Sequence, residues 1–271
     1  MKLFTFFILS LFLTNSFSEG NPPMPNPDIN NPITDQLIEQ LARKKIYFGH
    51  QSVGNNIMLG ITEILSDAQK KNFRIVESLD ADQYQGPMFA HSRVGYNMDP
   101  ESKIIGFNNY MANLQQWQPD IAMFKFCYID VRANANVSTL FQEYKSRMQQ
   151  LKEKYPEVNF VHFTVPLTIV QTGIRADIKK IIGKPIGGFA DNIKRNEYNT
   201  LLRQAYSGKE PVFDLAEIES SREDGSRIKF EYKHKDYYAL APEYGRDGRH
   251  LNALGRKIVA EKLLIFLASL E

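Results

Sequence analysis

The stretch YFGHQSVGNNI, residues 47–57, decides the first elements of the fold. An apolar run ends at Gly49, Ser52 follows two polar residues, and a segment with helical spacing begins at Asn55. This order predicts a strand that turns directly into a helix, with a serine at the turn. A serine at this place either caps the helix or is an exposed nucleophile, held between Gly49 and Gly54 so that its hydroxyl stays uncovered.

Strand-like and helix-like segments alternate along the rest of the chain. Strands are predicted at 45–48, 73–77, 121–126, 158–166 and 212–215, and helices at 35–44, 55–69, 102–117, 137–155, 192–206 and 253–270. The apolar run at 121–126 does not alternate, which is typical of a strand buried on both faces. The pattern predicts a parallel sheet with right-handed crossovers and helices on both faces. In such sheets the functional groups lie at the carboxyl ends of the strands.

Two segments precede this predicted domain. Residues 1–18 combine Lys2, an apolar run at 3–13 and small residues near position 18, which is the pattern of a signal peptide. The run is short for a bilayer span of roughly 20 residues. Residues 19–34 are rich in Pro and Asn and predict an extended tether. Residues 35–271 then form a single domain, and the protein is expected to be periplasmic or extracellular, without a stable membrane anchor.

The composition is that of an ordinary globular protein, with 43% hydrophobic and 24% charged residues. The chain has 33 basic and 31 acidic residues and no long block of like charge, which argues against a nucleic-acid partner. The single cysteine, Cys127, excludes an internal disulfide. A lone cysteine in an apolar run is typically a small core residue.

A serine nucleophile needs a base, and the base needs an orienting carboxylate. His250 fits best, because it lies in RDGRHLN, residues 246–252, three residues after Asp247 and directly before the final helix. Asn252 is the expected N-cap of that helix. The other histidines fit less well. His50 points differently along an extended segment, His91 and His234 fall in long connections, and His162 falls inside a strand.

Two other interpretations of Asp247 and His250 remain open. Their contact could be a hydrogen bond that only stabilises the loop. They could also ligate a metal, but zinc sites usually recruit three or four protein ligands and only these two residues cluster here. A metal site is therefore not expected.

The serine after the first strand, paired with Asp-x-x-His before the last helix, resembles the SGNH/GDSL hydrolase superfamily. FGHQSVG (48–54) is similar to the nucleophile block, with Gly-His-Gln-Ser in place of Gly-Asp-Ser, and RDGRHLN is similar to the terminal block. The resemblance covers residues 44–271. It implies a three-layer α/β/α sandwich with a parallel, flavodoxin-like five-stranded sheet. It also implies ester hydrolysis through an acyl-enzyme on Ser52, with His250 as base, Asp247 orienting it, and no metal or organic cofactor.

The resemblance also implies an oxyanion hole, a set of donors for the charge that develops on the ester carbonyl oxygen. Ser52 and Gly95, in HSRVGYN, are the expected backbone donors. The family's Gly-x-Asn-Asp block is altered here to CYID, so Ile129 stands where an asparagine would donate and only Asp130 is kept. Asn97 is the first candidate to replace that donor and Asn55 the second. Asp130 is expected to structure its loop.

The substrate is expected to be a small-molecule or carbohydrate ester, with a short acyl or acetyl group on a sugar as the leading interpretation. Arg93, Arg246 and Arg249 are expected to rim the pocket as solvated charges, and the alternative is that one of them binds an anionic group. RIKFEYK (227–233) could form a hairpin beside the site, and its tyrosines could stack on sugars. Two alternatives are an inactive secreted carbohydrate-binding protein, suggested by Ile129, and a lipid esterase. The lipid esterase is disfavoured because no amphipathic lid helix is evident in the long connections.

Overall fold

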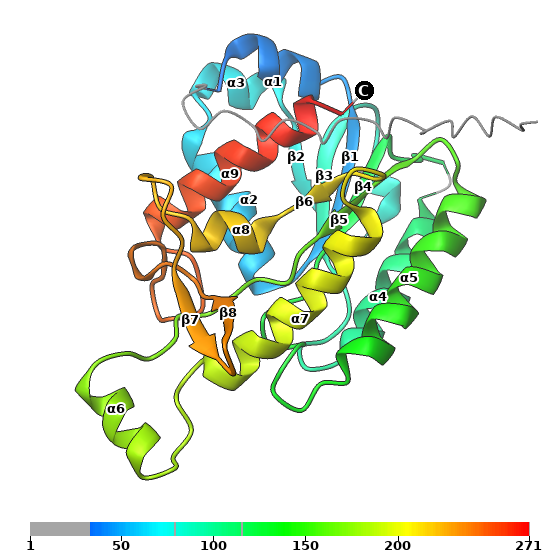
Figure 1. The fold of residues 1–271 in the computed structure, drawn as a ribbon. Helices are drawn as coiled ribbons and strands as arrows, with labels where there is room; N and C mark the ends of the chain where they lie inside the picture. The colour runs from blue at the N-terminus through cyan, green and yellow to red at the C-terminus, as the bar shows by residue number, and fades with distance from the viewer. Residues whose placement is uncertain (1–32, 79, 115, 271) are drawn as a thin grey trace, which may run out of the picture.

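The computed structural model describes residues 33–78, 80–114 and 116–270. The expected signal peptide and all but the last two residues of the expected tether lie outside these described residues. From Thr34, which caps the first helix by accepting from the Leu37 N–H, the chain forms a three-layer α/β/α sandwich (Figure 1).

The helices are α1 (Asp35–Leu41), α2 (Ser52–Ile64), α3 (Asp67–Asn72), α4 (Pro100–Asn113), α5 (Val137–Lys154), α6 (Ile174–Ile181), α7 (Phe189–Tyr206), α8 (Leu215–Ser220) and α9 (Ala253–Ala268). The strands are β1 (Lys45–His50), β2 (Ile75–Glu77), β3 (Met88–Arg93), β4 (Ile121–Phe124), β5 (Asn159–Phe163), β6 (Val212–Phe213), β7 (Lys229–Tyr232) and β8 (Lys235–Tyr238). Two short 3₁₀ helices are η1 (Ala81–Gln83) and η2 (Pro242–Tyr244).

The central sheet has the strand order β2-β3-β1-β4-β5-β6, and every pair in it is parallel. Without β2, the order of the other five strands is the expected flavodoxin-like one. The sheet therefore has one strand more than the sequence predicted. The segment at 73–77 forms the outer strand β2, whereas the strand beside β1 is β3, which the sequence analysis missed. Polar His91 and Ser92 interrupt its apolar run and concealed it.

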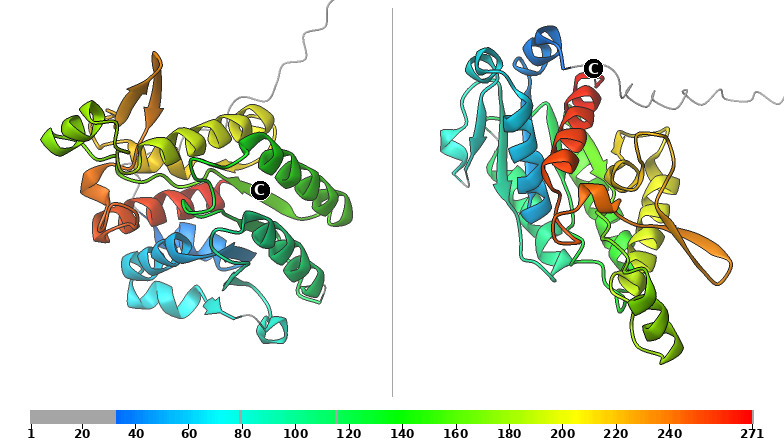
Figure 2. Two further views of the ribbon diagram at one scale, coloured as in Figure 1. Left: turned by 90° about the horizontal axis from the view of Figure 1, so that it is seen from below. Right: turned by 90° about the vertical axis from the view of Figure 1, so that its left-hand side faces the viewer.

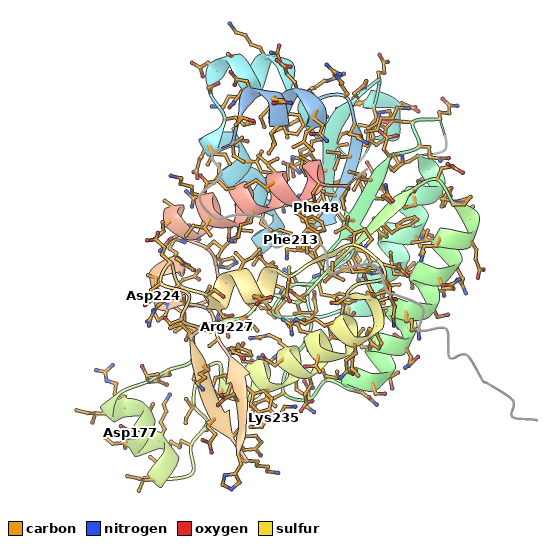
Figure 3. The ribbon with its side chains drawn as sticks, turned by 45° about the horizontal axis from the view of Figure 1, so that its top comes forward. Phe48, Asp177, Phe213, Asp224, Arg227 and Lys235 are labelled. Atoms are coloured by element: carbon orange, nitrogen blue, oxygen red, sulfur yellow. The ribbon has the colours of Figure 1, made fainter. Side chains whose placement is uncertain are left out.

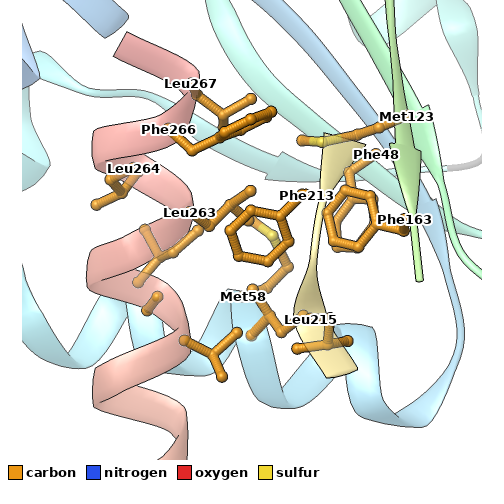
Figure 4. Close-up of a cluster of buried hydrophobic side chains, with 14 of the residues drawn as sticks. Phe48, Met58, Met123, Phe163, Phe213, Leu215, Leu263, Leu264, Phe266 and Leu267 are labelled. Carbon is orange, nitrogen blue, oxygen red and sulfur yellow. The ribbon is translucent and has the colours of Figure 1, made fainter. Parts of the chain in front are cut away.

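Apolar side chains cover both faces of the sheet. One cluster joins the sheet to α1, α2, α8 and α9, and the other joins it to α4, α5 and α7. Figure 2 shows these two helical layers from the sides. In the first cluster Phe48, Phe163 and Phe213, from three strands, pack against Leu263 and its neighbours on α9 (Figure 4). Cys127 is fully buried, as predicted for a core residue.

Two segments project from this body. β7 and β8 form the antiparallel hairpin that the sequence suggested, and Phe230 on β7 packs against Phe189 at the start of α7. α6 lies at the periphery beyond the hairpin (Figures 1 and 2). Its isoleucines recur at helical spacing, so one long connection does contain an amphipathic helix, which the sequence pattern had not indicated. Within the described part of the chain, no helix has the length and apolarity to cross a membrane.

Candidate active site

Ser52 is the first residue of α2, directly beyond the carboxyl end of β1. Gln51 is the N-cap, so the alternative that Ser52 caps the helix is wrong. The Ser52 side chain is partly exposed, and its hydroxyl makes no hydrogen bond to any residue that the structure describes. The free N–H groups and the dipole at a helix start favour negative charge, such as that of an alkoxide or a carbonyl oxyanion.

The glycines around Ser52 make room for neighbouring side chains. A Cβ on Gly54 would lie 2.2 Å from the Cβ of His50, and one on Gly49 would lie 3.0 Å from Val94. Neither glycine has a positive φ. Small residues are therefore required here because the strand and the helix approach each other closely. The serine is exposed because it lies at the turn between β1 and α2. The two glycines are needed for close packing and not for an unusual backbone conformation.

His50 and His91 form a buried pair behind the serine. His91 lies on β3, not in a long connection as predicted, and its Nδ1 is 3.0 Å from Nε2 of His50. Burial, then the adjacent His91, lowers the pKa of His50 to about 3, and burial lowers the pKa of His91. His50 Nδ1 donates to the carbonyl of Gln51, the residue before Ser52, at 3.1 Å. Neutral imidazoles thus support the turn without being open to substrate.

Asp247 and His250 are held in one rigid loop. Oδ2 of Asp247 accepts from Nδ1 of His250 at 2.8 Å, while Oδ1 accepts the backbone N–H groups of Arg249 and His250 at 3.0 and 2.9 Å. Gly248 occupies the left-handed region with φ of +80°. Partial burial acts to raise the pKa of Asp247, but these hydrogen bonds outweigh it and lower the pKa to about 2. The carboxylate therefore stays ionised, and Nε2 of His250 is left to accept a proton.

The His250 loop is joined directly to the helix that begins at Ser52. The backbone N–H of Leu251 donates to Oδ1 of Asn56 at 3.3 Å. Asn56 is four residues after Ser52, and side chains at that spacing share one face of a helix. Asn252 caps α9 as predicted, accepting from the Gly255 N–H. These contacts bring the base and the serine, 198 positions apart in the sequence, to the same edge of the sheet.

Among the residues that the structure describes, no hydrogen bond joins the Ser52 hydroxyl to the His250 ring. Such catalytic hydrogen bonds are often long without substrate and tighten in the complex. The His250 ring also packs against the Tyr128 ring in a T-shaped arrangement, with ring centroids 5.6 Å apart. Tyr128 comes from the turn after β4, so a third strand end contributes to the site.

The expected oxyanion donors lie at neighbouring strand ends. Gly95 follows β3 with φ of +57°. A Cβ there would lie 2.5 Å from the backbone nitrogen of Lys103, so only glycine fits. The side chain of Gln51 holds this loop by donating to the carbonyl of Gly95 at 2.7 Å. Asn55 lies in the first turn of α2, where its N–H donates to the Gln51 carbonyl.

Asn97 lies beside the turn that carries the altered block. Buried Lys103 donates to Oδ1 of Asn97 at 3.1 Å and pairs with Oδ2 of Asp130 at 2.5 Å. Asp130 also accepts the backbone N–H of Cys127, which gives it the loop-structuring contacts that were expected. Because Lys103 donates to the oxygen of the Asn97 amide, the Nδ2 group of that amide points away from the Lys103 ammonium group. Ile129 is partly buried against the core and also lines a cavity.

This cavity adjoins the Asp247 side of the loop. It has a volume of about 400 Å³ and is lined by residues from the turns after β4 and β5, the start of α7 and the loop at 247–249. Three arginines line it, of which the sequence analysis had singled out only Arg249. Arg195 is 2% exposed, and burial lowers its pKa to about 10, yet it stays cationic because Tyr128 O, Thr168 Oγ1 and other acceptors surround it.

The other two guanidinium groups, of Arg132 and Arg249, are exposed and make no ion pair with any described residue. Arg93 and Arg246 do not line the cavity. In the described ranges, there is no group of three or more His, Cys, Asp or Glu side chains that could hold a metal ion. The site therefore offers a base, a hydroxyl, helix-start N–H groups and a polar, partly cationic chamber.

The sequence matches no family model and no curated protein. Similar solved structures include a candidate platelet activating factor protein from Streptococcus pneumoniae, 12% identical, covering 86% of this chain and 90% of that one with a TM-score of 0.45. A protein assigned to the G-D-S-L lipolytic family from Desulfitobacterium hafniense is 9% identical, with coverage of 82% and 99% and a TM-score of 0.44. A candidate lipase from Chitinophaga pinensis is 14% identical, with coverage of 81% and 95% and a TM-score of 0.37.

Proposed function

We propose that this protein is an exported serine esterase that hydrolyses a carboxylic ester, with a short acyl group on a carbohydrate as the leading substrate class. The observation that carries the proposal is the Asp247–His250 hydrogen bond, in a loop joined through Leu251 and Asn56 to the helix that starts at Ser52. A bond network of this kind serves a general base, because it fixes both the tautomer and the direction of the imidazole.

The proposed reaction has two halves. Ser52 Oγ attacks the ester carbonyl carbon while Nε2 of His250 takes the hydroxyl proton. The bond to the alcohol then breaks, His250 gives the proton to the leaving oxygen, and the acyl group stays on Ser52. Water attacks this acyl-enzyme, His250 takes a proton from the water, and the carboxylic acid leaves as the proton returns to Ser52. The backbone N–H groups of Ser52 and Gly95 and the amide of Asn97 stabilise the oxyanion.

The cavity narrows the substrate class. Arg132 and Arg249 offer guanidinium donors without acidic partners, and such groups bind carboxylates and other oxyanions in a planar, bidentate way. The proposed substrate therefore carries a negative group in addition to its ester, as an acylated sugar acid does. Tyr232 of the hairpin, which is partly exposed and also contacts Phe189, is the residue proposed to stack on a sugar ring.

The second candidate is a secreted carbohydrate-binding protein on the same fold with little or no turnover. Ile129 favours it, because an isoleucine cannot donate to an oxyanion and one missing donor costs about 10²–10³ in kcat. A lipid esterase is the third candidate, and the exposed apolar face of α6 favours it.

Release of p-nitrophenol from p-nitrophenyl acetate separates the first two candidates. The wild-type protein should show a burst as the acyl-enzyme forms, and Ser52→Ala should abolish it. Ser146→Ala, which changes an exposed serine on α5, is the matched control and should keep the burst. Equal rates for wild type and Ser52→Ala would exclude the esterase and leave the binding protein.

A further inference from the structure

The largest apolar exposure in the described residues is concentrated on one short segment. Ile174, Ile178, Ile181 and Ile182 are 78, 50, 84 and 56% exposed. Single exposed apolar residues are normal on protein surfaces, but a contiguous group marks a site of interaction. The segment is α6 with the residue that follows it.

The isoleucines form one face, and this face points away from the protein. Successive residues of a helix are about 100° apart, so the four side chains fall within an arc of about 100°. Ala176 lies on the opposite side of the helix and is 5% exposed. The helix thus contacts the body through a small residue and presents its large apolar ones to the surroundings. The views in Figures 1 and 2 agree that α6 is peripheral, and Figure 3 marks it by Asp177.

The segment that carries this face is mostly basic, with Arg175 on one side of the isoleucines and Asp177 on the other. Residues 174–184 hold Arg175, Lys179, Lys180 and Lys184 against a single acid, Asp177. The exposed side chains of Arg175 and Lys184 form no ion pair with the described part of the chain. An exposed apolar face on a segment of net positive charge is typical of helices that lie in the headgroup region of an anionic bilayer.

The position of α6 relates this face to the candidate active site. The segment leaves the body at Gln171 and returns at Gly187, where the Gln171 N–H donates to the Gly187 carbonyl at 2.9 Å. Both residues line the cavity that Asp247 and Arg249 also line. A surface bound by α6 would therefore lie near the mouth of that cavity.

We propose that α6 docks the protein reversibly on a membrane that contains anionic phospholipids. The isoleucine face enters the interface, and Arg175 and Lys184 contact the phosphate groups. An eight-residue helix is far too short to span a bilayer, so the attachment is peripheral and sensitive to salt. This docking is independent of ester hydrolysis and holds whether or not Ser52 is a nucleophile.

Co-sedimentation with lipid vesicles tests the proposal on the processed protein, residues 19–271. Vesicles of phosphatidylglycerol and phosphatidylcholine should bind it at least tenfold more tightly than phosphatidylcholine alone, and 0.5 M salt should release it. Ile181→Asp and the double variant Arg175→Glu/Lys184→Glu should each lose at least tenfold in binding. Ile105→Asp, which changes an isoleucine on α4 that is 42% exposed, is the matched control and should bind as wild type.

Ser52→Ala should also bind as wild type, which keeps this test separate from that of the esterase. Docking is refuted if the wild-type protein does not bind anionic vesicles, or if Ile181→Asp binds them as tightly as wild type. It is also refuted if Ile105→Asp loses as much binding as Ile181→Asp. A wild-type dimer that Ile181→Asp converts to monomer, without any vesicle binding, would assign the face to a contact between two copies instead.

Discussion

Asn56 and Leu251 are separated by 195 positions in the chain, yet the Leu251 N–H donates to Oδ1 of Asn56 at 3.3 Å. This bond lies one helical turn from Ser52 and one residue from His250. The helices behind it are also closely joined, because Gly60 on α2 lies against the Arg256 carbonyl on α9 and Arg256 pairs with Glu63 at 2.6 Å. The two halves of the candidate site are therefore positioned by the packing of α2 against α9.

Asn56→Ala should lower kcat for p-nitrophenyl acetate by about tenfold to a hundredfold, since small displacements between reacting groups have effects of this size. Thermal unfolding should change little, because one neutral hydrogen bond contributes only about 1 kcal/mol. Glu63→Gln removes a contact of the same helix pair farther from the site and should leave kcat within about twofold. Equal kcat for Asn56→Ala and wild type would show that the bond does not position the base.

Asp247→Asn should lower kcat by about 10⁴, because an amide would orient the wrong tautomer of His250. In the folded protein the pKa of Asp247 is about 2, below its ordinary value, so the carboxylate is ionised above about pH 4 and is protonated only as the pH falls through 2. The pH dependence of kcat/KM between pH 4 and 8 should therefore show no inflection from Asp247. A loss below tenfold for Asp247→Asn would contradict its assigned role.

Asn97→Asp tests the replaced oxyanion donor. The carboxylate keeps an acceptor for Lys103 but removes the amide N–H, so the fold should persist while kcat falls by about 10²–10³. Asn55→Asp is the comparison, because Asn55 is the other amide near the serine. If Asn55→Asp loses activity and Asn97→Asp does not, the donor is Asn55, and the role given to Asn97 is wrong.

Arg132→Gln and Arg249→Gln should raise KM about tenfold or more for an acetylated sugar acid and leave KM for the neutral acetylated sugar unchanged. The reason is that each guanidinium lines the cavity without an acidic partner. Arg93→Gln, on an arginine outside the cavity, should affect neither substrate. Equal changes for the charged and neutral esters would remove the argument for an anionic substrate.

The buried histidine pair predicts a pH dependence of stability. The folded pKa of His50 is about 3, below its ordinary value of 6.5, so protons bind the unfolded chain better. The free energy of unfolding should fall as the pH drops from about 6.5 toward 3, by about 1 kcal/mol per pH unit for this group. Urea unfolding of His50→Gln should show a shallower loss between pH 6.5 and 4. An unchanged slope would mean that His50 is protonated in the folded state.

Much of the architecture followed from local patterns. Continuous apolar runs located β1, β4 and β5, and 3.6-residue periodicity located α2, α5, α7 and α9. β3 was missed because it contains two polar residues, His91 and Ser92. Both are buried, since in the fold His91 hydrogen-bonds to His50 and Ser92 hydrogen-bonds to Tyr47. α6 was missed because its eight residues lie in a long connection flanked by glycines.

In the candidate site, too, contacts between residues close in sequence could be predicted, whereas contacts between distant segments could not. Asp247 and His250 are close in sequence, so their spacing alone predicted the contact that the loop shows. Arg132 and Arg195 were not predicted, because their segments come together only when the turns after β4 and β5 meet α7. The reason for Gly54 was also beyond local patterns, since the space it leaves is filled by His50.

Mass spectrometry of the protein after reaction with a fluorophosphonate measures the central assignment most directly. One adduct is expected, located on the peptide that contains Ser52, which forms in wild type and is absent from Ser52→Ala. Its formation in His250→Ala should be slower by at least a hundredfold, because the hydroxyl loses its base. A protein that stays unlabelled, or that carries the adduct elsewhere, would contradict the assignment of Ser52 as nucleophile.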